Sequence, residues 1–126
     1  MLRSRLLLSA AGVAAASVVA ATAATGAPAR VFLTVTPHVV LRGNVVHLHG
    51  SAGSCPAGDT VFIISHAFVA THQFATIPAV LATARRGGAF DVKTRIPVYR
   101  HPGLYHIVVR CGGGNLGING AVRVLR

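Results

Sequence analysis

Few side chains in this chain of 126 residues could carry out chemistry, and the thiols are the most informative of them. Cys55 and Cys111 are its only two cysteines. In an exported protein an even pair of cysteines is expected to close as a disulfide, because the compartment is oxidising. Both sulfur atoms would then be used to brace the fold, so we do not expect a thiolate nucleophile.

A His-x-His pair, His47 and His49, has the spacing of a shared metal site. Residues two apart on a β-strand lie on the same face, so the two imidazoles could bind one ion. If their strand pairs with residues 89–96, their neighbours are Lys93 and Arg95, and a cationic face disfavours a divalent ion. We therefore expect solvated surface histidines, with a metal at His47 and His49 as the alternative.

The remaining polar residues do not favour catalysis. Asp59 and Asp91 are the only two carboxylate side chains, and paired-acid chemistry would need them close together. Ser65 and His66 are adjacent, so in a strand their side chains would point to opposite faces. The sequence therefore predicts no enzyme, no catalytic residue and no cofactor.

The N-terminal segment predicts export. Arg3 and Arg5 precede an apolar run from Leu6 to about Ala24, and an A-x-A cleavage site ends the segment 1–29. Cleavage leaves residues 30–126 as one domain. The alternative is an uncleaved membrane anchor, because a run of about 20 residues can just span a bilayer. We expect a secreted or cell-surface protein with no stable membrane insertion after cleavage.

The charge balance indicates an anionic partner. The chain has 12 Lys and Arg residues against two Asp, a formal net charge of +10 at pH 7. Such an imbalance favours association with polyanions. For an exported protein we expect an anionic polymer of the cell envelope or an envelope protein, and not a nucleic acid. The alternative is that the basic residues serve solubility alone.

The domain reads as β-strands almost throughout, and turn residues separate the strands. The seven predicted strands are 31–36, 44–50, 60–66, 77–85, 89–96, 104–111 and 118–125. Residues 89–96 alternate most clearly, with Phe90 on one face and Asp91 on the other. Seven short strands and one cysteine pair predict an all-β fold, a seven-stranded antiparallel immunoglobulin-like β-sandwich with Greek-key connections.

The sequence leaves two details of this fold open, the role of Tyr105 and the conformation of the segment 67–76. Tyr105 lies near the start of its strand, after a Pro-Gly turn, and could form a tyrosine corner or be an ordinary core residue. The segment 67–76 has few turn residues and could be a long connection, an extra edge strand or a short helix. Cys55 falls in a loop, so the disulfide would staple one end of the sandwich.

Short motifs of turn residues recur along the whole domain. They are Val35-Thr36-Pro37, Leu41-Arg42-Gly43, His49-Gly50, Cys55-Pro56-Ala57-Gly58, Gly88-Ala89-Phe90, Pro102-Gly103-Leu104-Tyr105 and Arg110-Cys111-Gly112-Gly113. This pattern resembles that of small secreted actinobacterial proteins with an immunoglobulin-like domain. The resemblance implies the fold, but most such proteins have no assigned function. Residues 67–77 depart from the pattern, which usually has a shorter polar connection there.

The architecture is also similar to that of the neocarzinostatin-like apoproteins. That similarity implies a small-molecule carrier with a chromophore in a cleft between the sheets. Those proteins usually have two disulfides and are mostly acidic, whereas this chain has one cysteine pair and is basic.

Two surfaces are candidate sites in the predicted sandwich. At one end, stapled glycine-rich loops form a ligand platform. Its candidate residues are Ser51, Ser54, Asp59, Arg85, Arg86, Gly113 and Asn115. The alternative is that the glycines only satisfy tight turns.

The second surface is the outer face of the sheet that holds strands 60–66 and 104–111. Taking Tyr105, Ile107 and Val109 as core leaves an apolar strip with basic edges, which suggests protein contact or self-association. Its residues are Val61, Ile63, His106, Val108 and Arg110. The alternative is that the segment 67–76 folds over this strip.

We therefore expect an exported, non-catalytic binding or cell-surface module that contacts envelope proteins or anionic polymers. The alternative function is a small-molecule carrier.

Overall fold

A computed structural model describes residues 11–17 and 30–126 of the chain. Most of the predicted signal peptide, residues 1–10 and 18–29, lies outside the described residues. In the part that is described, no helix has the length and apolar character needed to cross a membrane.

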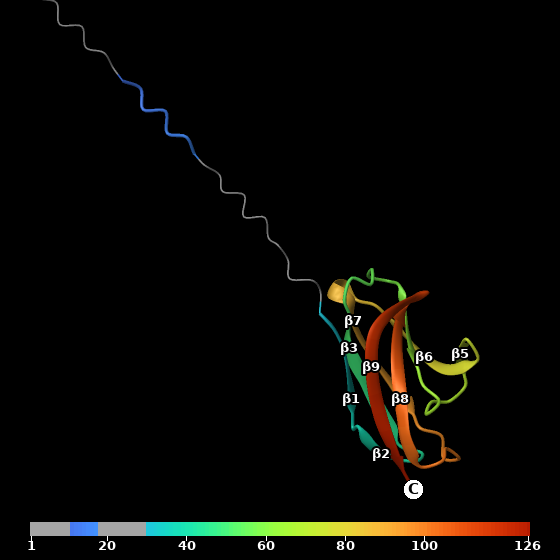
Figure 1. The fold of residues 1–126 in the computed structure, drawn as a ribbon. Coiled ribbons are helices and arrows are strands. Elements are labelled where there is room, and N and C mark those ends of the chain that lie inside the picture. The colour runs from blue at the N-terminus through green and yellow to red at the C-terminus, as the bar shows by residue number, and fades with distance from the viewer. Residues whose placement is uncertain (1–10, 18–29) are drawn as a thin grey trace, which may run out of the picture.

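The described chain is all-β, as predicted, and consists of short strands joined by turns (Figure 1). The strands are β1 (Val31–Thr36), β2 (Val39–Leu41), β3 (Val45–Ala52), β4 (Thr60–Ile64), β5 (His72–Phe74), β6 (Ile77–Thr83), β7 (Ala89–Arg95), β8 (Gly103–Cys111) and β9 (Gly114–Leu125), with a 3-10 turn η1 (Arg86–Gly88). Each of the seven predicted strands is present, with ends that differ by a few residues. Residues 30–126 hold nine strands and not seven, because β2 and β5 add to them.

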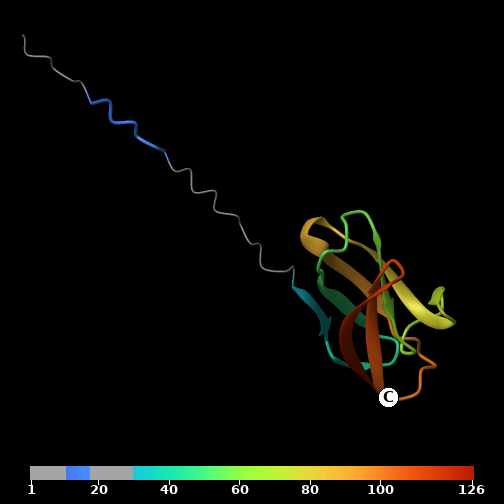
Figure 2. The same ribbon diagram turned by 45° about the horizontal axis from the view of Figure 1, so that its top comes forward.

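The strands form two sheets that pack face to face as a sandwich (Figures 1 and 2). One sheet has three strands in the order β1-β3-β7, and the other has six in the order β2-β9-β8-β4-β6-β5. The prediction of purely antiparallel strands is wrong at one place, since β2 pairs with β9 in parallel. Pro37 lacks the backbone N–H needed to continue the β1 ladder, and the chain then enters the other sheet as β2.

Apolar side chains from the two inner faces fill the space between the sheets. The largest fully buried ones are Phe68, Phe90, Leu48, Ile63, Ile96, Ile107, Val46, Val61, Val109, Val122 and Val124. The alternation predicted for β7 is confirmed, because Phe90 is buried while Asp91 and Lys93 are exposed. The pocket described below lies on an outer face, not between the sheets.

The disulfide and the tyrosine corner are both present. Cys55 and Cys111 are bonded, with their Cα atoms 5.8 Å apart. Cys55 lies in the connection between β3 and β4, and Cys111 ends β8, so the bond staples one end of the sandwich as predicted. The hydroxyl of Tyr105 donates a hydrogen bond of 2.6 Å to the carbonyl oxygen of His101. This bond ties the start of β8 to the preceding turn.

The segment 67–76 forms an edge strand, one of the three alternatives left open by the sequence. It begins with a turn in which Phe68 is fully buried, and it continues as β5, which pairs with β6. Ala75 and Thr76 join β5 to β6 with φ angles of 49° and 72°. Positive φ at both residues of a two-residue hairpin loop favours Asn-Gly, so alanine and threonine are strained there.

Candidate binding surfaces

The predicted protein-contact strip is wrong in its β4 residues. Val61 and Ile63 are completely buried and face the core, opposite Cys111 and Val109 of β8. Phe62 and Ile64 therefore point to the outer face. Because every position from 61 to 64 is apolar, the sequence of β4 has no alternation that could distinguish its two faces.

The β8 residues of the predicted strip do lie on the outer face, and β5 covers part of it. His106 is exposed, while Val108 and Arg110 are half-buried. The ring of Phe74 on β5 lies 5.2 Å from that of Phe62, measured between ring centroids. The strip is thus partly covered by the segment 67–76, the alternative that the sequence left open.

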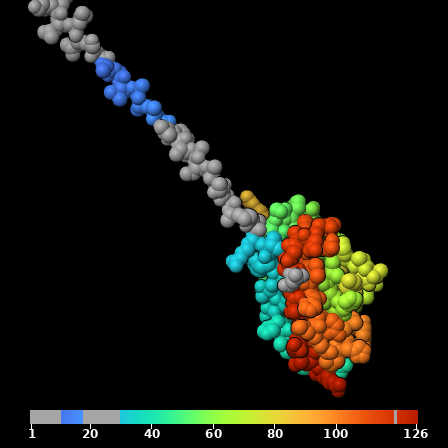
Figure 3. Space-filling view, in the orientation of Figure 1, coloured from blue at the N-terminus to red at the C-terminus, as the bar shows by residue number. Residues whose placement is uncertain are grey.

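Four exposed apolar side chains lie further along the same sheet. Register places these side chains on the outer face of β2, β9 and β8, beside Arg123. They are Val39, Leu41, Leu104 and Leu125, which are 41–50% exposed. We call these four residues the apolar patch. Figure 3 shows β8 and β9 as one continuous surface, with β1 on one side and the segment around β5 on the other.

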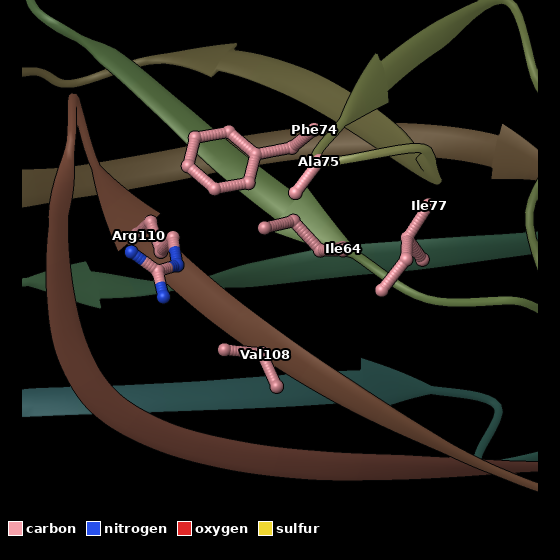
Figure 4. A pocket seen from close by; sticks show the side chains of 6 residues that line it. All are labelled: Ile64, Phe74, Ala75, Ile77, Val108 and Arg110. Carbon is pink, nitrogen blue, oxygen red and sulfur yellow. The ribbon is translucent and has the colours of Figure 1, made fainter.

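A small pocket opens on the outer face between β5 and β8 (Figure 4). Its volume is about 170 Å³. It is lined by Ile64, Phe74, Ala75, Ile77, Val108 and Arg110. The side chains of Phe74 and Arg110 approach each other across it, with the guanidinium carbon 5.0 Å from the ring centroid. The sequence analysis named Arg110 and Val108 as site residues but missed Phe74, which is distant from them in the sequence and close to them only in the folded chain.

The guanidinium of Arg110 also makes a hydrogen bond. Its Nη1 atom donates to the carbonyl oxygen of Gly113, at 3.2 Å, in the turn between β8 and β9. In the described part of the chain, the ion pair present is that of His47 and Asp91, on the other sheet. Arg110 therefore presents a positive charge to the pocket without a carboxylate partner there.

The end of the sandwich that holds the disulfide brings the predicted ligand residues into one region. Polar side chains there form hydrogen bonds to the backbone of the loops. The Ser51 hydroxyl donates to the carbonyl oxygen of Gly87, at 3.2 Å, next to Arg86. The side-chain oxygen of Asn115 accepts a bond of 2.9 Å from the backbone N–H of Gly117. The first contact joins two loops and the second lies within one turn, so the ligand platform stays a prediction.

The other predicted residues of this end are also placed by the structure. Ser54, Arg85 and Gly113 are exposed in its connections. The Asp59 carboxylate lies within 4.8 Å of the sulfur atoms of Cys55 and Cys111. Because both sulfur atoms are in the disulfide, this group is not a metal site.

The neighbours of the two histidines differ in part from the prediction. His47 lies opposite Lys93, as expected, but His49 lies opposite Asp91, and Arg95 lies opposite Val45. His47 and His49 share a face, with ring centroids 4.9 Å apart. The Nε2 atom of His47 bonds to the Asp91 carboxylate, so the face carries one negative charge among its cations. This hydrogen bond is the main reason that the pKa of Asp91 lies below its ordinary value of 3.8.

Replacing Asp91 by asparagine is expected to make the stability of the protein less sensitive to acidification. A carboxyl whose pKa is lowered in the folded protein stabilises it above the pKa of the unfolded chain. That contribution is lost as the pH falls through the folded-state pKa, below 3.8. The thermal unfolding midpoint should therefore decrease more between about pH 5 and about pH 2 for the natural protein than for Asp91→Asn. Equal decreases would contradict a stabilising bond between Asp91 and His47.

Comparison with known proteins finds neither a matching family model nor a matching curated protein. Two similar solved structures are an alkylpurine DNA glycosylase, AlkC of Pseudomonas fluorescens, bound to DNA that contains an abasic site analogue, and an uncharacterised protein from Bacillus anthracis str. Ames. The first has a TM-score of 0.43 and 21% identity, and the match covers 75% of this chain and 29% of that chain. The second has a TM-score of 0.40 and 15% identity, with 75% and 84% covered.

The glycosylase match corrects one prediction. The sequence predicted that the chain is not an enzyme, but a protein to which it is similar is one. We therefore withdraw that exclusion. The chain spans less than a third of the length of the glycosylase. A likeness at this TM-score assigns no activity to the present chain.

Proposed function

We propose that the chain is an exported immunoglobulin-like binding module whose partner is an anionic polymer of the cell envelope. The observation that carries this proposal is the distribution of charge on the folded domain. Residues 30–126 contain ten Lys and Arg residues against two Asp, which is a net charge of +8. Eight of these ten basic residues are exposed. Such a surface attracts polyanions.

The outer face of the three-stranded sheet presents this charge most regularly. Lys93 and Arg95 lie two residues apart on β7, about 7 Å along the strand. On β3, His47 lies opposite Lys93, and His49 lies two residues further along, opposite Asp91. We call these four residues the basic face. Its one acid, Asp91, already bonds to His47, so a negatively charged chain that runs along β7 meets mainly cations.

The disulfide supports the extracellular part of the proposal. Structural disulfides form and persist in oxidising compartments such as the outside of the cell. The basic, cysteine-paired domain and the N-terminal signal pattern thus point to the same location.

Retention on a heparin column tests the proposal. We expect retention that falls steeply as salt rises, because binding through charge is screened and releases counterions. Lys93→Gln/Arg95→Gln should raise the heparin dissociation constant about tenfold or more, since each cation near an anionic surface contributes about 1 kcal/mol. Arg42→Gln/Arg123→Gln is the matched control. It removes two exposed cations elsewhere and should change binding by about threefold or less.

The outcomes separate the two parts of the proposal. Equal losses in both double variants would overturn the assignment to the basic face. Retention that is absent, or that does not depend on salt, would overturn the anionic partner.

Contact with an envelope protein, or self-association, is a second proposal. The apolar patch favours it, because contiguous exposed apolar side chains mark protein contacts.

A further inference from the structure

We propose that the pocket under Phe74 binds a small carboxylate whose apolar part is one aromatic ring or a short acyl chain. The pocket lies on the six-stranded sheet, whereas the basic face lies on the three-stranded sheet. This inference therefore goes beyond the proposed function and does not depend on it.

The size of the pocket sets the size of the apolar group. A cavity of about 150 Å³ with an aliphatic and aromatic lining is known to hold benzene. The present pocket has a volume of about 170 Å³. Its walls are the side chains of Ile64, Ile77 and Val108, with the ring of Phe74 above them (Figure 4). The present pocket is open to solvent on one side, so one ring or a chain of similar volume would cover its apolar walls and displace water from them while part of the ligand stays exposed.

The charge in the pocket selects a carboxylate over a neutral or cationic group. Arg110 is the charged residue of the lining, and its Nη1 atom is anchored to Gly113. The other N–H groups of its guanidinium can donate to an anion, and the planar fork matches a carboxylate. Neither carboxylate of the chain forms an ion pair with Arg110. An incoming cation would be repelled by it.

The hairpin that forms one wall is itself strained. Ala75 lines the pocket and, like Thr76, has a positive φ angle, which residues with a Cβ rarely adopt. Strained backbone persists where its surroundings hold it, and it is common at ligand clamps. Phe74, the residue before this loop, lies on the outer face, where its ring meets Phe62 and Arg110.

Titration of the ¹⁵N-labelled protein followed by NMR tests the proposal. Benzoate and hexanoate represent the ring and the chain, and benzyl alcohol and benzylamine carry a neutral and a cationic group on the same ring. For ligands this small we expect dissociation constants in the millimolar range for at least one carboxylate. Amide signals of residues 74–77 and 108–110 should shift. Benzyl alcohol should bind about fivefold more weakly, and benzylamine should not bind measurably.

Variants separate the charge from the apolar walls. Arg110→Gln should weaken carboxylate binding about fivefold more than it weakens binding of benzyl alcohol, whereas Phe74→Ala should weaken both to a similar extent. Arg123→Gln removes a cation from the same sheet outside the pocket and should leave carboxylate binding unchanged. Circular dichroism checks that each variant folds.

Three results would overturn the proposal. They are carboxylate binding no tighter than that of benzyl alcohol, an equal loss in Arg123→Gln, and signal shifts that map away from the pocket. Heparin retention reports on the basic face, so failure of one proposal is distinguishable from failure of the other.

Discussion

Replacing Cys55 and Cys111 by alanine is expected to lower the free energy of unfolding by about 4 kcal/mol. The bond closes a loop with a sequence separation of 56 residues, and the loop-entropy model assigns a value of this size to such a closure. A domain of this length is stable by only about 5–15 kcal/mol, so the loss is a large fraction of the total. Urea unfolding, followed by circular dichroism, measures the change.

The single variants distinguish the cross-link from packing. Either Cys55→Ala or Cys111→Ala breaks the same bond, so each should cost about as much as the double variant. Costs that add would show that the sulfur atoms stabilise the fold by packing and not by the covalent link. A double variant as stable as the natural protein would contradict the bracing role of the disulfide.

Strand positions could largely be predicted because turn residues mark where strands end. Pro37 ends β1, Gly87 and Gly88 precede β7, and β8 begins at the Pro102-Gly103 turn. β2 was not predicted because three apolar residues carry no periodic signal. It exists through its pairing with β9, more than eighty residues away. Pairing over such a separation depends on the whole fold and cannot be predicted from the local sequence.

The faces of the strands were predictable only where polar and apolar residues alternate. In β7 the alternation is clear, and the structure has the predicted faces. In β4 every central residue is apolar, so Phe62 and Val61 could each have been the core residue. The register with β8 decides the matter, and it buries Val61. A shift by one residue exchanges the two faces of a strand, which explains the wrong half of the predicted strip.

The pocket could not be predicted for a related reason. Phe74 and Arg110 lie far apart in the sequence and meet because the β5–β6 hairpin bends over the outer face. The residues of the hairpin loop, Ala75 and Thr76, are not those that favour such a turn. Tertiary contacts therefore determine the conformation here, and local sequence preference does not.

The second large effect is expected at Phe68, in the connection that leads from β4 to β5. Phe68→Ala should lower the free energy of unfolding by about 3–5 kcal/mol. The side chain is completely buried in the hydrophobic core, so its removal loses apolar burial and leaves a cavity. Urea unfolding measures the loss. The neighbouring Val69 is 37% exposed, and Val69→Ala is the matched control, with an expected cost below about 1 kcal/mol.

The same variant tests whether the segment that leads to the pocket wall is part of the core. The Phe68 carbonyl oxygen accepts a hydrogen bond of 3.0 Å from Arg100, and its side chain is held in the core, so the connection is fixed where it leaves β4. β5 follows a few residues later and carries Phe74 over Arg110. If Phe68→Ala costs no more than Val69→Ala, the segment 67–76 is a surface loop and not a part of the core. A cost in the expected range means that the connection leading to this wall of the pocket is anchored in the interior of the sandwich by Phe68.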